Sequence, residues 1–414
     1  MVASTDIKFY VHTNNNAPQL PNTWGALANI LDACLVTGLG SQAVSSTGIN
    51  NKVLTLTTGT AHNLKVGQVI KLTGATQAEF NKEYRITLAP DATTIQVDLD
   101  NSPTLTALTG SMSIALPPLG WVKEFSTGGK RAYRNADFID SDRPFLRVVD
   151  EIDPVWGASY AKYAKVGIVD QMIDIDTMIG TQTPYEAAAP NKNWVGTGSG
   201  ESAYNGWAKW YYARTRDVYE TGWYDSEGSE NGNKRWLVVG NKDWFYLLPS
   251  QVDSVYPNIY FFGKLNTESQ RLYGLSSSLQ YDTAKNNTAT NNKTALSAGA
   301  AAFLLHGNNT GNPALSLYNG NRLAPNGPSL FFPDLDASLL LADVYIPFKL
   351  SLNPLIKMPA LKWLLNPYKY GYDYITVESS KKFFLLKTVF ASTAKPSGNQ
   401  DLGSLSGLIA FELS

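Results

Sequence analysis

The alternation of apolar and polar residues predicts a strand-rich chain with one clear helix near its beginning. From Asn22 to Gly40, in NTWGALANILDACLVTGLG, apolar side chains recur three and four residues apart, which is the spacing of one buried helix face. This face comprises Leu27, Ile30, Leu31, Cys34 and Leu35. Asn22 or Thr23 is expected to cap the start of the helix, and Gly38 is expected to end it.

A compact all-β segment is predicted directly after this helix. In VLTLTTGTAHNLKVGQVIKLTG, from Val53 to Gly74, two runs of Val, Leu, Ile and Thr alternate with the two-residue period of a strand. Three further short strands are predicted before Pro117-Pro118, in KEYRITLA, TTIQVDL and GSMSIAL. Five strands in about 65 residues are typical of a small barrel. We therefore expect residues 49–117 to form an inserted five-stranded β-barrel that folds independently.

The rest of the chain is also predicted to be mainly β. Gly128-Gly129 predicts a hairpin in GWVKEFSTGGKRAYRN, and Gly240-Asn241 predicts another in NKRWLVVGNKDWFYLLP. We predict an α+β, mainly β chain, in which residues 1–48 and 118–250 form a β-rich host domain with the N-terminal helix. Residues 251–414 are predicted to form a C-terminal β-rich domain, with its first residue left open, and GLIAFELS at the end indicates a strand built into a sheet.

Composition excludes several classes of partner. The 414 residues are 43% hydrophobic and 17% charged, with a net charge of −1, so no overall field attracts nucleic acid or an anionic membrane. No apolar run approaches the roughly 20 residues that span a bilayer, and the first residues show no signal peptide. We expect no specific nucleic acid, no membrane and synthesis in a cytoplasm. Cys34 is the single cysteine, which excludes an intrachain disulfide and predicts a buried core thiol.

The sequence predicts no catalytic residue, no metal and no cofactor. The three histidines, none with a second ligand nearby in sequence, are His12, His62 and His306. His62 is expected to have a structural role in the turn before Leu64. Two acid-rich phrases contain Asp150, Glu151 and Asp153, and Asp170, Asp174 and Asp176. Oxygen-rich clusters can bind Ca²⁺, but the EF-hand spacing is absent, so we expect these acids to be solvated.

Aromatic residues are abundant, at 12% of the chain, with 22 Tyr, 16 Phe and 10 Trp. They are densest in WAKWYYARTRDVYETGWYDSE, which also carries the carboxylates Asp217, Glu220 and Asp225. The candidates for a glycan or subunit interface in this phrase are Trp207, Trp210, Tyr212, Trp223 and Tyr224. Since half of the side chains of a strand face a core, core packing or a subunit interface is favoured over glycan binding. Glycoside hydrolysis, which requires paired carboxylates, is the least favoured.

Several phrases together resemble a family of tailed-bacteriophage virion structural proteins. They are GALANILDACLVTGLG, GWVKEFSTGGKRAYRN, FLRVVDE and KRWLVVGNKDWFYLL. In relatives of this type the GLG and GW phrases stand close together, whereas here the β segment separates them. That segment is similar to small barrels inserted in phage tail and baseplate proteins. The resemblance implies a non-enzymatic structural component of the virion that acts by packing between subunits, and it favours the tail, neck or baseplate region.

The same resemblance leaves two alternatives and sets the expected partners. One alternative is a capsid decoration or head-fibre protein, and the second is a particle protein that binds a host surface glycan. The implied partners are copies of the chain itself and other virion proteins, assembled into the virion in the cytoplasm of the bacterial host. We expect a homo-oligomer, with a trimer favoured. Its contacts should involve mainly the part after Gly120, and the inserted barrel should project outward.

Overall fold

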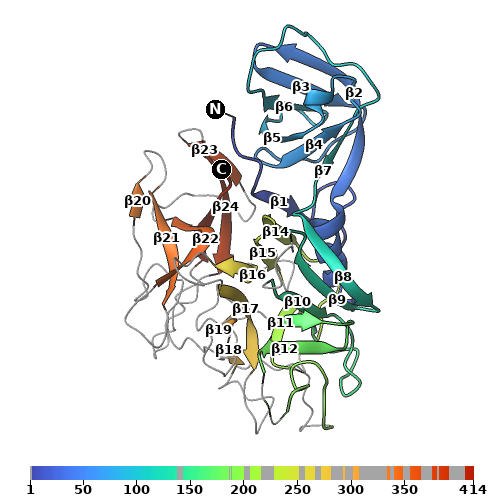
Figure 1. Cartoon of the computed structure of the whole chain (residues 1–414), viewed down its shortest axis with the longest axis vertical. Coiled ribbons are helices and arrows are strands. Elements are labelled where there is room, and N and C mark those ends of the chain that lie inside the picture. Colours follow the sequence, from blue (N-terminus) through green and yellow to red (C-terminus); the bar gives the residue numbers. More distant parts are fainter. Residues whose placement is uncertain are drawn as a thin grey trace.

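A closed barrel, a large sheet and a smaller sheet make up the described part of the chain, with one helical segment near the N-terminus (Figure 1). The computed structural model describes residues 2–137, 143–185, 187, 189–199, 206–215, 228–250, 257–265, 272–280, 292–293, 302–306, 333–335, 340–347, 355–364, 375–379, 382–390 and 406–414. Within these residues every strand pairing is antiparallel. The predicted mainly β character and the N-terminal helix are confirmed.

The large sheet has thirteen described strands and extends from the centre of the view to its lower part (Figure 1). Its strands are β1 (Lys8–Val11), β8 (Trp121–Thr127), β9 (Lys130–Asn135), β10 (Phe145–Val149), β11 (Lys162–Met172), β12 (Met178–Thr183), β13 (Ala208–Ala213), β14 (Trp236–Gly240), β15 (Trp244–Pro249), β16 (Tyr260–Leu265), β17 (Leu272–Gln280), β18 (Asn292–Lys293) and β19 (Ala302–His306). The main path runs β1-β14-β15-β16-β17-β13-β11-β10-β9-β8, while β12 pairs with β11, and β18 and β19 pair with β17. Both predicted hairpins, β8–β9 and β14–β15, are present.

The second sheet has six strands and lies beside the large one (Figure 1). Its strands are β20 (Pro333–Leu335), β21 (Leu340–Pro347), β22 (Leu355–Leu364), β23 (Ile375–Ser379), β24 (Lys382–Phe390) and β25 (Ser406–Glu412), in the order β20-β21-β22-β25-β24-β23. The C-terminal phrase is indeed a strand inside a sheet. The expected division at residue 250 does not coincide with the sheets, because β16 to β19 follow that residue and still belong to the large sheet.

The barrel closes with six strands, so the predicted count of five is wrong by one. Its strands are β2 (Leu39–Asn50), β3 (Val53–Thr58), β4 (Val69–Thr73), β5 (Glu83–Leu88), β6 (Thr94–Asp98) and β7 (Ser113–Leu116), in the order β2-β3-β6-β5-β4-β7, with a 3-10 turn, η2 (Ala78–Phe80). The additional strand, β2, begins well before residue 49 and pairs with both β3 and β7. Most of its side chains are polar and at least partly exposed, so it lacks the apolar alternation that identified the other five.

The predicted helix forms and ends at Gly38 as expected, but its N-terminal cap differs from the prediction. It consists of α1 (Ala26–Leu31) followed by the π-helical segment η1 (Asp32–Thr37), and its five predicted apolar side chains are all buried. The predicted caps, Asn22 and Thr23, are not used. The N-cap residue is Gly25, which has no side chain that could accept a hydrogen bond from the first helical amides. Gly38 ends the helix at a φ of 79°, where a Cβ atom would lie 2.5 Å from the carbonyl oxygen of Leu116.

The large sheet is covered on both faces, and alternate residues of its strands point to different cores. In β1, Tyr10 faces a core shared with the helix and the barrel, whereas Phe9 and Val11 face the second sheet. In β15, Phe245 and Tyr246 divide in the same way. The first core continues without interruption from the barrel interior to the large sheet. The barrel is therefore packed against the body of the protein.

Side chains close the outer edge of β1, where no further strand pairs within the described part of the chain. The amide of Gln68 donates to the carbonyl of Phe9 at 3.0 Å, and the Arg85 guanidinium donates to that of Ile7 at 2.9 Å. The amide of Val11 donates to the Asn14 side chain at 2.9 Å. Asn14 and Gln68 also hydrogen-bond each other. Because Gln68 and Arg85 belong to the barrel, the barrel supplies the donors that a neighbouring strand would otherwise provide.

Replacing Arg85 with Met should destabilise the protein by roughly 3 kcal/mol, because buried carbonyls would lose their donor. Arg85 is almost fully buried and also donates to the carbonyls of Ser4, Gly67 and Leu413 at 2.8, 2.6 and 2.8 Å. Chemical denaturation of both proteins measures the difference. The matched control is Lys82→Met, which removes an exposed barrel cation paired with Asp100 at 3.2 Å and should cost less than about 1 kcal/mol. Equal effects of the two changes would contradict the proposed edge contact.

Candidate functional site

The aromatic residues proposed for an interface are core residues wherever the structure describes them. Trp207, Trp210 and Tyr212 are at most 1% exposed. The Trp210 indole donates to the carbonyl of Ser276 at 2.8 Å and stacks on Tyr260, with ring centroids 5.7 Å apart. These three side chains therefore cannot form a glycan platform or a subunit surface, because they are buried in the core, and β13, which carries Trp210 and Tyr212, is buried along its whole length.

The other members of that phrase cannot be placed in the same way. Trp223 and Tyr224 lie outside the described residues, as do the carboxylates Asp217, Glu220 and Asp225. Most of the tryptophans that the structure describes are buried within one subunit. The buried tryptophans are Trp121, Trp156, Trp194, Trp207, Trp210, Trp236 and Trp244. A sheet with two covered faces needs many large apolar side chains, so the aromatic content does not by itself require a partner.

The acid-rich phrases are used for separate internal contacts, and two of the acids expected to be solvated are buried. Asp150 and Asp153 are 1% and 2% exposed. The Asp153 carboxylate pairs with Lys165 at 2.8 Å, and Asp176 pairs with Arg147 at 2.7 Å. Among the described residues, no group of three or more His, Cys, Asp or Glu side chains is arranged to bind a metal ion.

The histidines also take part in local contacts. His62 accepts a hydrogen bond from the amide of Leu64 at 2.9 Å, within the predicted turn. His306 lies 2.6 Å from the Asp170 carboxylate and 2.9 Å from the Thr183 hydroxyl. This acid–imidazole–hydroxyl chain has the wrong orientation for nucleophilic attack, because Thr183 is fully buried whereas Asp170 is the partly exposed member. It joins β19 to β11 and β12.

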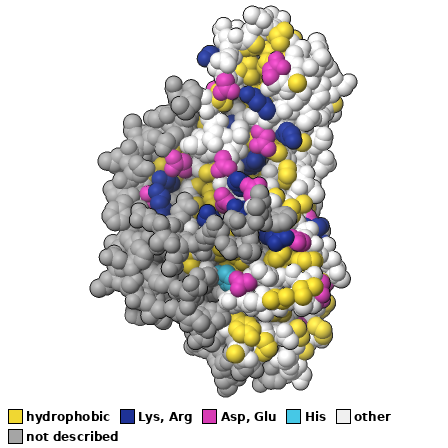
Figure 2. All heavy atoms as spheres, viewed as in Figure 1, with side chains coloured by type: hydrophobic (Ala, Val, Ile, Leu, Met, Phe, Trp, Pro, Cys, Tyr) yellow, Lys and Arg dark blue, Asp and Glu magenta, His cyan; other side chains and the backbone are white. Residues whose placement is uncertain are grey.

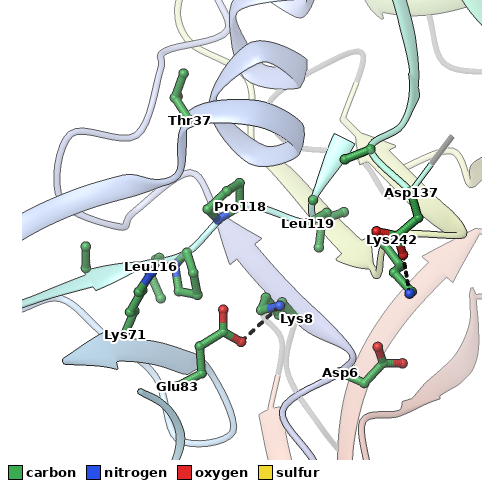
Figure 3. Close-up of a pocket in the computed structure, with 14 residues that line it drawn as sticks. Asp6, Lys8, Thr37, Lys71, Glu83, Leu116, Pro118, Leu119, Asp137 and Lys242 are labelled. Carbon is green, nitrogen blue, oxygen red and sulfur yellow. Dashed lines mark hydrogen bonds and ion pairs between the residues drawn. The ribbon is translucent and has the colours of Figure 1, made fainter. Parts of the chain in front are cut away.

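A pocket of about 550 Å³ lies where the barrel meets the large sheet (Figure 3). Its apolar part comes from the segment that leaves the barrel, and includes Leu116, Pro118 and Leu119. A hydrogen bond to β1 holds this segment in place: the Tyr10 hydroxyl donates to the carbonyl of Pro117 at 2.5 Å. Figure 3 shows that β1, the barrel and the loop before β15 all contribute side chains to the pocket.

Most charged side chains that line the pocket between the barrel and the large sheet form ion pairs with one another. Lys8 contacts Glu83 at 3.1 Å, and Lys242 forms an ion pair with Asp137 (Figure 3). Hydrogen bonding and the charge of Lys242 lower the pKa of Asp137. On the face shown in Figure 2, acidic and basic side chains lie close together below the barrel. The pocket lining contains no histidine or cysteine. This arrangement is suited to holding two parts of the chain together and offers no nucleophile beside a base.

A second pocket, of about 500 Å³, lies at the start of α1. Its wall includes Asp150, whose carboxylate replaces the missing local cap of the helix: it accepts the amides of Leu27 and Ala28 at 3.0 and 3.1 Å. The Tyr212 hydroxyl donates to the other carboxylate oxygen at 2.7 Å. Burial raises the pKa of Asp150 to about 6, although these hydrogen bonds act in the opposite direction. No sequence signal links Asp150 to a helix more than a hundred residues earlier.

Comparisons with known proteins identify no family. No family model matches the sequence, and no curated protein matches it. One solved structure, a phage phi92 endosialidase, aligns with 90% of this chain at 9% identity, with a TM-score of 0.17. The alignment covers 51% of that protein, so the chain spans about half its length. A similarity at this level supports no conclusion about shared fold or activity. Among the described residues, no helix has the length and apolar character needed to cross a membrane.

The raised pKa of Asp150 predicts that ionisation of this group destabilises the fold. An unfolded aspartate has a pKa of about 3.9, so between pH 4 and pH 6 the unfolded chain loses this proton while the folded chain retains it. Relative to Asp150→Asn, the wild-type free energy of unfolding should therefore fall by up to about 3 kcal/mol as the pH rises through this window. Asparagine can keep the same contacts, accepting the helix amides and donating to Tyr212.

Denaturation of both proteins at a series of pH values measures this difference. The matched control is Asp174→Asn. Hydrogen bonds from the Asp176 amide and the Thr177 side chain lower the pKa of Asp174, so its contribution to stability is lost as the pH falls, which is the opposite sign. A wild-type minus Asp150→Asn difference that does not change between pH 4 and pH 7 would refute the assignment.

Proposed function

We propose that this chain is a non-enzymatic structural component of a tailed-bacteriophage virion, in the tail, neck or baseplate, and that it acts by packing against other subunits. The observation that carries the proposal is the rigid attachment of the barrel to the large sheet. Gln68 and Arg85 bond the edge of β1, and the first core runs continuously through both parts. A module held in one orientation suits an assembly part that must present a surface at a constant position. The phage-like phrases described above support the same assignment.

Two alternatives lead to different locations or partners. A capsid decoration or head-fibre protein would have the same rigid build but would be found on heads. A host-glycan-binding protein would need an accessible polar pocket with an aromatic wall, which Trp207, Trp210 and Tyr212 do not provide because they are buried. In both alternatives, as in the main proposal, the protein binds and does not turn over a substrate.

The location can be tested on particles from the bacterial host that encodes this chain. We expect quantitative mass spectrometry to find the chain in gradient-purified virions, at several copies per particle, and to find it in the tail fraction after heads and tails are separated. Recovery with tail-free heads would support the decoration or head-fibre alternative. Presence of the chain in the lysate and its absence from purified particles would refute a virion role.

Subunit contacts are proposed through the part after Gly120, and two exposed isoleucines at one end of the β11–β12 hairpin support this. Ile173 and Ile179 are 64% and 43% exposed, so a partner subunit that covered them would remove apolar surface from water. Changing both to Asp should reduce cross-linked oligomers of the 45.2 kDa chain, with trimers favoured, by about tenfold or more in solution. Mass measurement after cross-linking gives the result.

Leu88→Asp is the matched control for this experiment. Leu88 is 49% exposed but lies on the barrel, which is expected to project away from the contacts, so its replacement should leave the oligomers unchanged. Wild-type protein that remains monomeric at all concentrations, both free and in cross-linked particles, would show that self-association is not part of its function.

A further inference from the structure

We propose that the pocket at the start of α1 binds a neutral saccharide of one or two rings. It is formed by three segments: the residues just before and within α1, the turn of the β8–β9 hairpin, and the residues after β10. Its volume of about 500 Å³ lies within the range of small-ligand sites. The inference concerns the binding of a small ligand and goes beyond the proposed virion role.

The aromatic wall of this pocket is Trp24, and its ring is held in place before any ligand arrives. Its centroid lies 5.4 Å from that of Tyr163 in an edge-on arrangement, and the Lys162 ammonium lies 5.5 Å from the ring centroid. A ring fixed in this way loses little conformational entropy on binding. The indole nitrogen is itself buried, so the ring contributes its carbon surface to the pocket, which suits the apolar face of a sugar ring.

Polar and apolar groups around the indole match the surface of a sugar. The exposed Asn29 carboxamide, which makes no hydrogen bond within the described chain, offers a donor and an acceptor. Glu151 uses one carboxylate oxygen for the Gly129 amide, at 2.7 Å, which orients the side chain. Ile152 is 42% exposed and provides an aliphatic surface for C–H groups. A saccharide has this combination of hydroxyl groups and apolar ring faces.

The charges select a neutral ligand over an acidic one. Asp150 and Glu151 both line the pocket, and the single cation there, Arg131, already contacts Asp32 at 3.1 Å. An acidic sugar would therefore meet two carboxylates and a neutralised guanidinium, which disfavours its binding. The helix amides do not contribute, because the Asp150 carboxylate occupies those of Leu27 and Ala28.

The test is saturation-transfer NMR on the full chain with glucose, galactose, rhamnose, N-acetylglucosamine and N,N′-diacetylchitobiose, each at about 10 mM, where weak sugar sites with millimolar dissociation constants are visible. We expect transfer to at least one neutral sugar, and a reduction in affinity of about tenfold or more in Asn29→Ala and in Trp24→Ala. Asn29→Ala is an exposed helical change that favours folding, so the result does not depend on a destabilised variant. N-acetylneuraminic acid should show no transfer.

Asn50→Ala is the matched control, since Asn50 is an exposed asparagine on the barrel, and it should bind the sugar as the wild type does. The proposal is refuted if none of the five neutral sugars shows transfer, if Asn29→Ala binds as tightly as the wild type, or if the acidic sugar binds equally well. These outcomes are separate from the virion proposal, because a chain that is abundant in purified tails but binds no sugar would leave that role in place and remove only this site.

Discussion

The outer edge of β1 is the constraint on which the arrangement of the other parts depends. An open edge of a large sheet exposes unpaired carbonyl and amide groups, and such groups pair with other chains unless they are covered. Here Arg85 and Gln68 of the barrel bond the carbonyls of Ile7 and Phe9, and Arg85 also reaches the carbonyl of Leu413 near the C-terminus. One guanidinium thus connects the barrel, the first strand of the large sheet and the end of the second sheet.

The two covered faces of the large sheet explain the composition of the chain. Each strand in its middle must supply apolar side chains in both directions, as β14 does with Val238 on one face and Val239 on the other. Tyrosine and tryptophan serve this purpose when their polar atoms find partners inside. Tyr212 bonds Asp150, and Trp236 donates to the carbonyl of Pro18 at 2.9 Å. The aromatic residues are therefore more informative about the core than about a partner.

Features encoded by neighbouring residues were predictable from the sequence, and features that depend on distant residues were not. The helix around Cys34 and five barrel strands are predictable from local periodicity, because apolar residues recur with the period of a helix or of a strand within each of these segments. β2 escaped detection because its apolar positions are few, and its place in the barrel is set by pairing with β3 and β7. Asp150 could not be assigned to the helix for the same reason, since its capping role exists only once strand β10 lies beside α1.

The sequence predicts a barrel that folds independently of the rest of the chain. The contacts between the barrel and the large sheet argue against this prediction. Closing a long insertion costs little chain entropy, and this consideration alone favours a removable module. Yet removal of the barrel would leave the β1 carbonyls without donors and would open the continuous core between barrel and sheet. The loss of these contacts is of the order of several kcal/mol, which is a large fraction of the stability of a typical domain. The segment predicted to be a removable insertion thus covers an edge that the rest of the described chain leaves open, and we expect its removal to destabilise the whole fold.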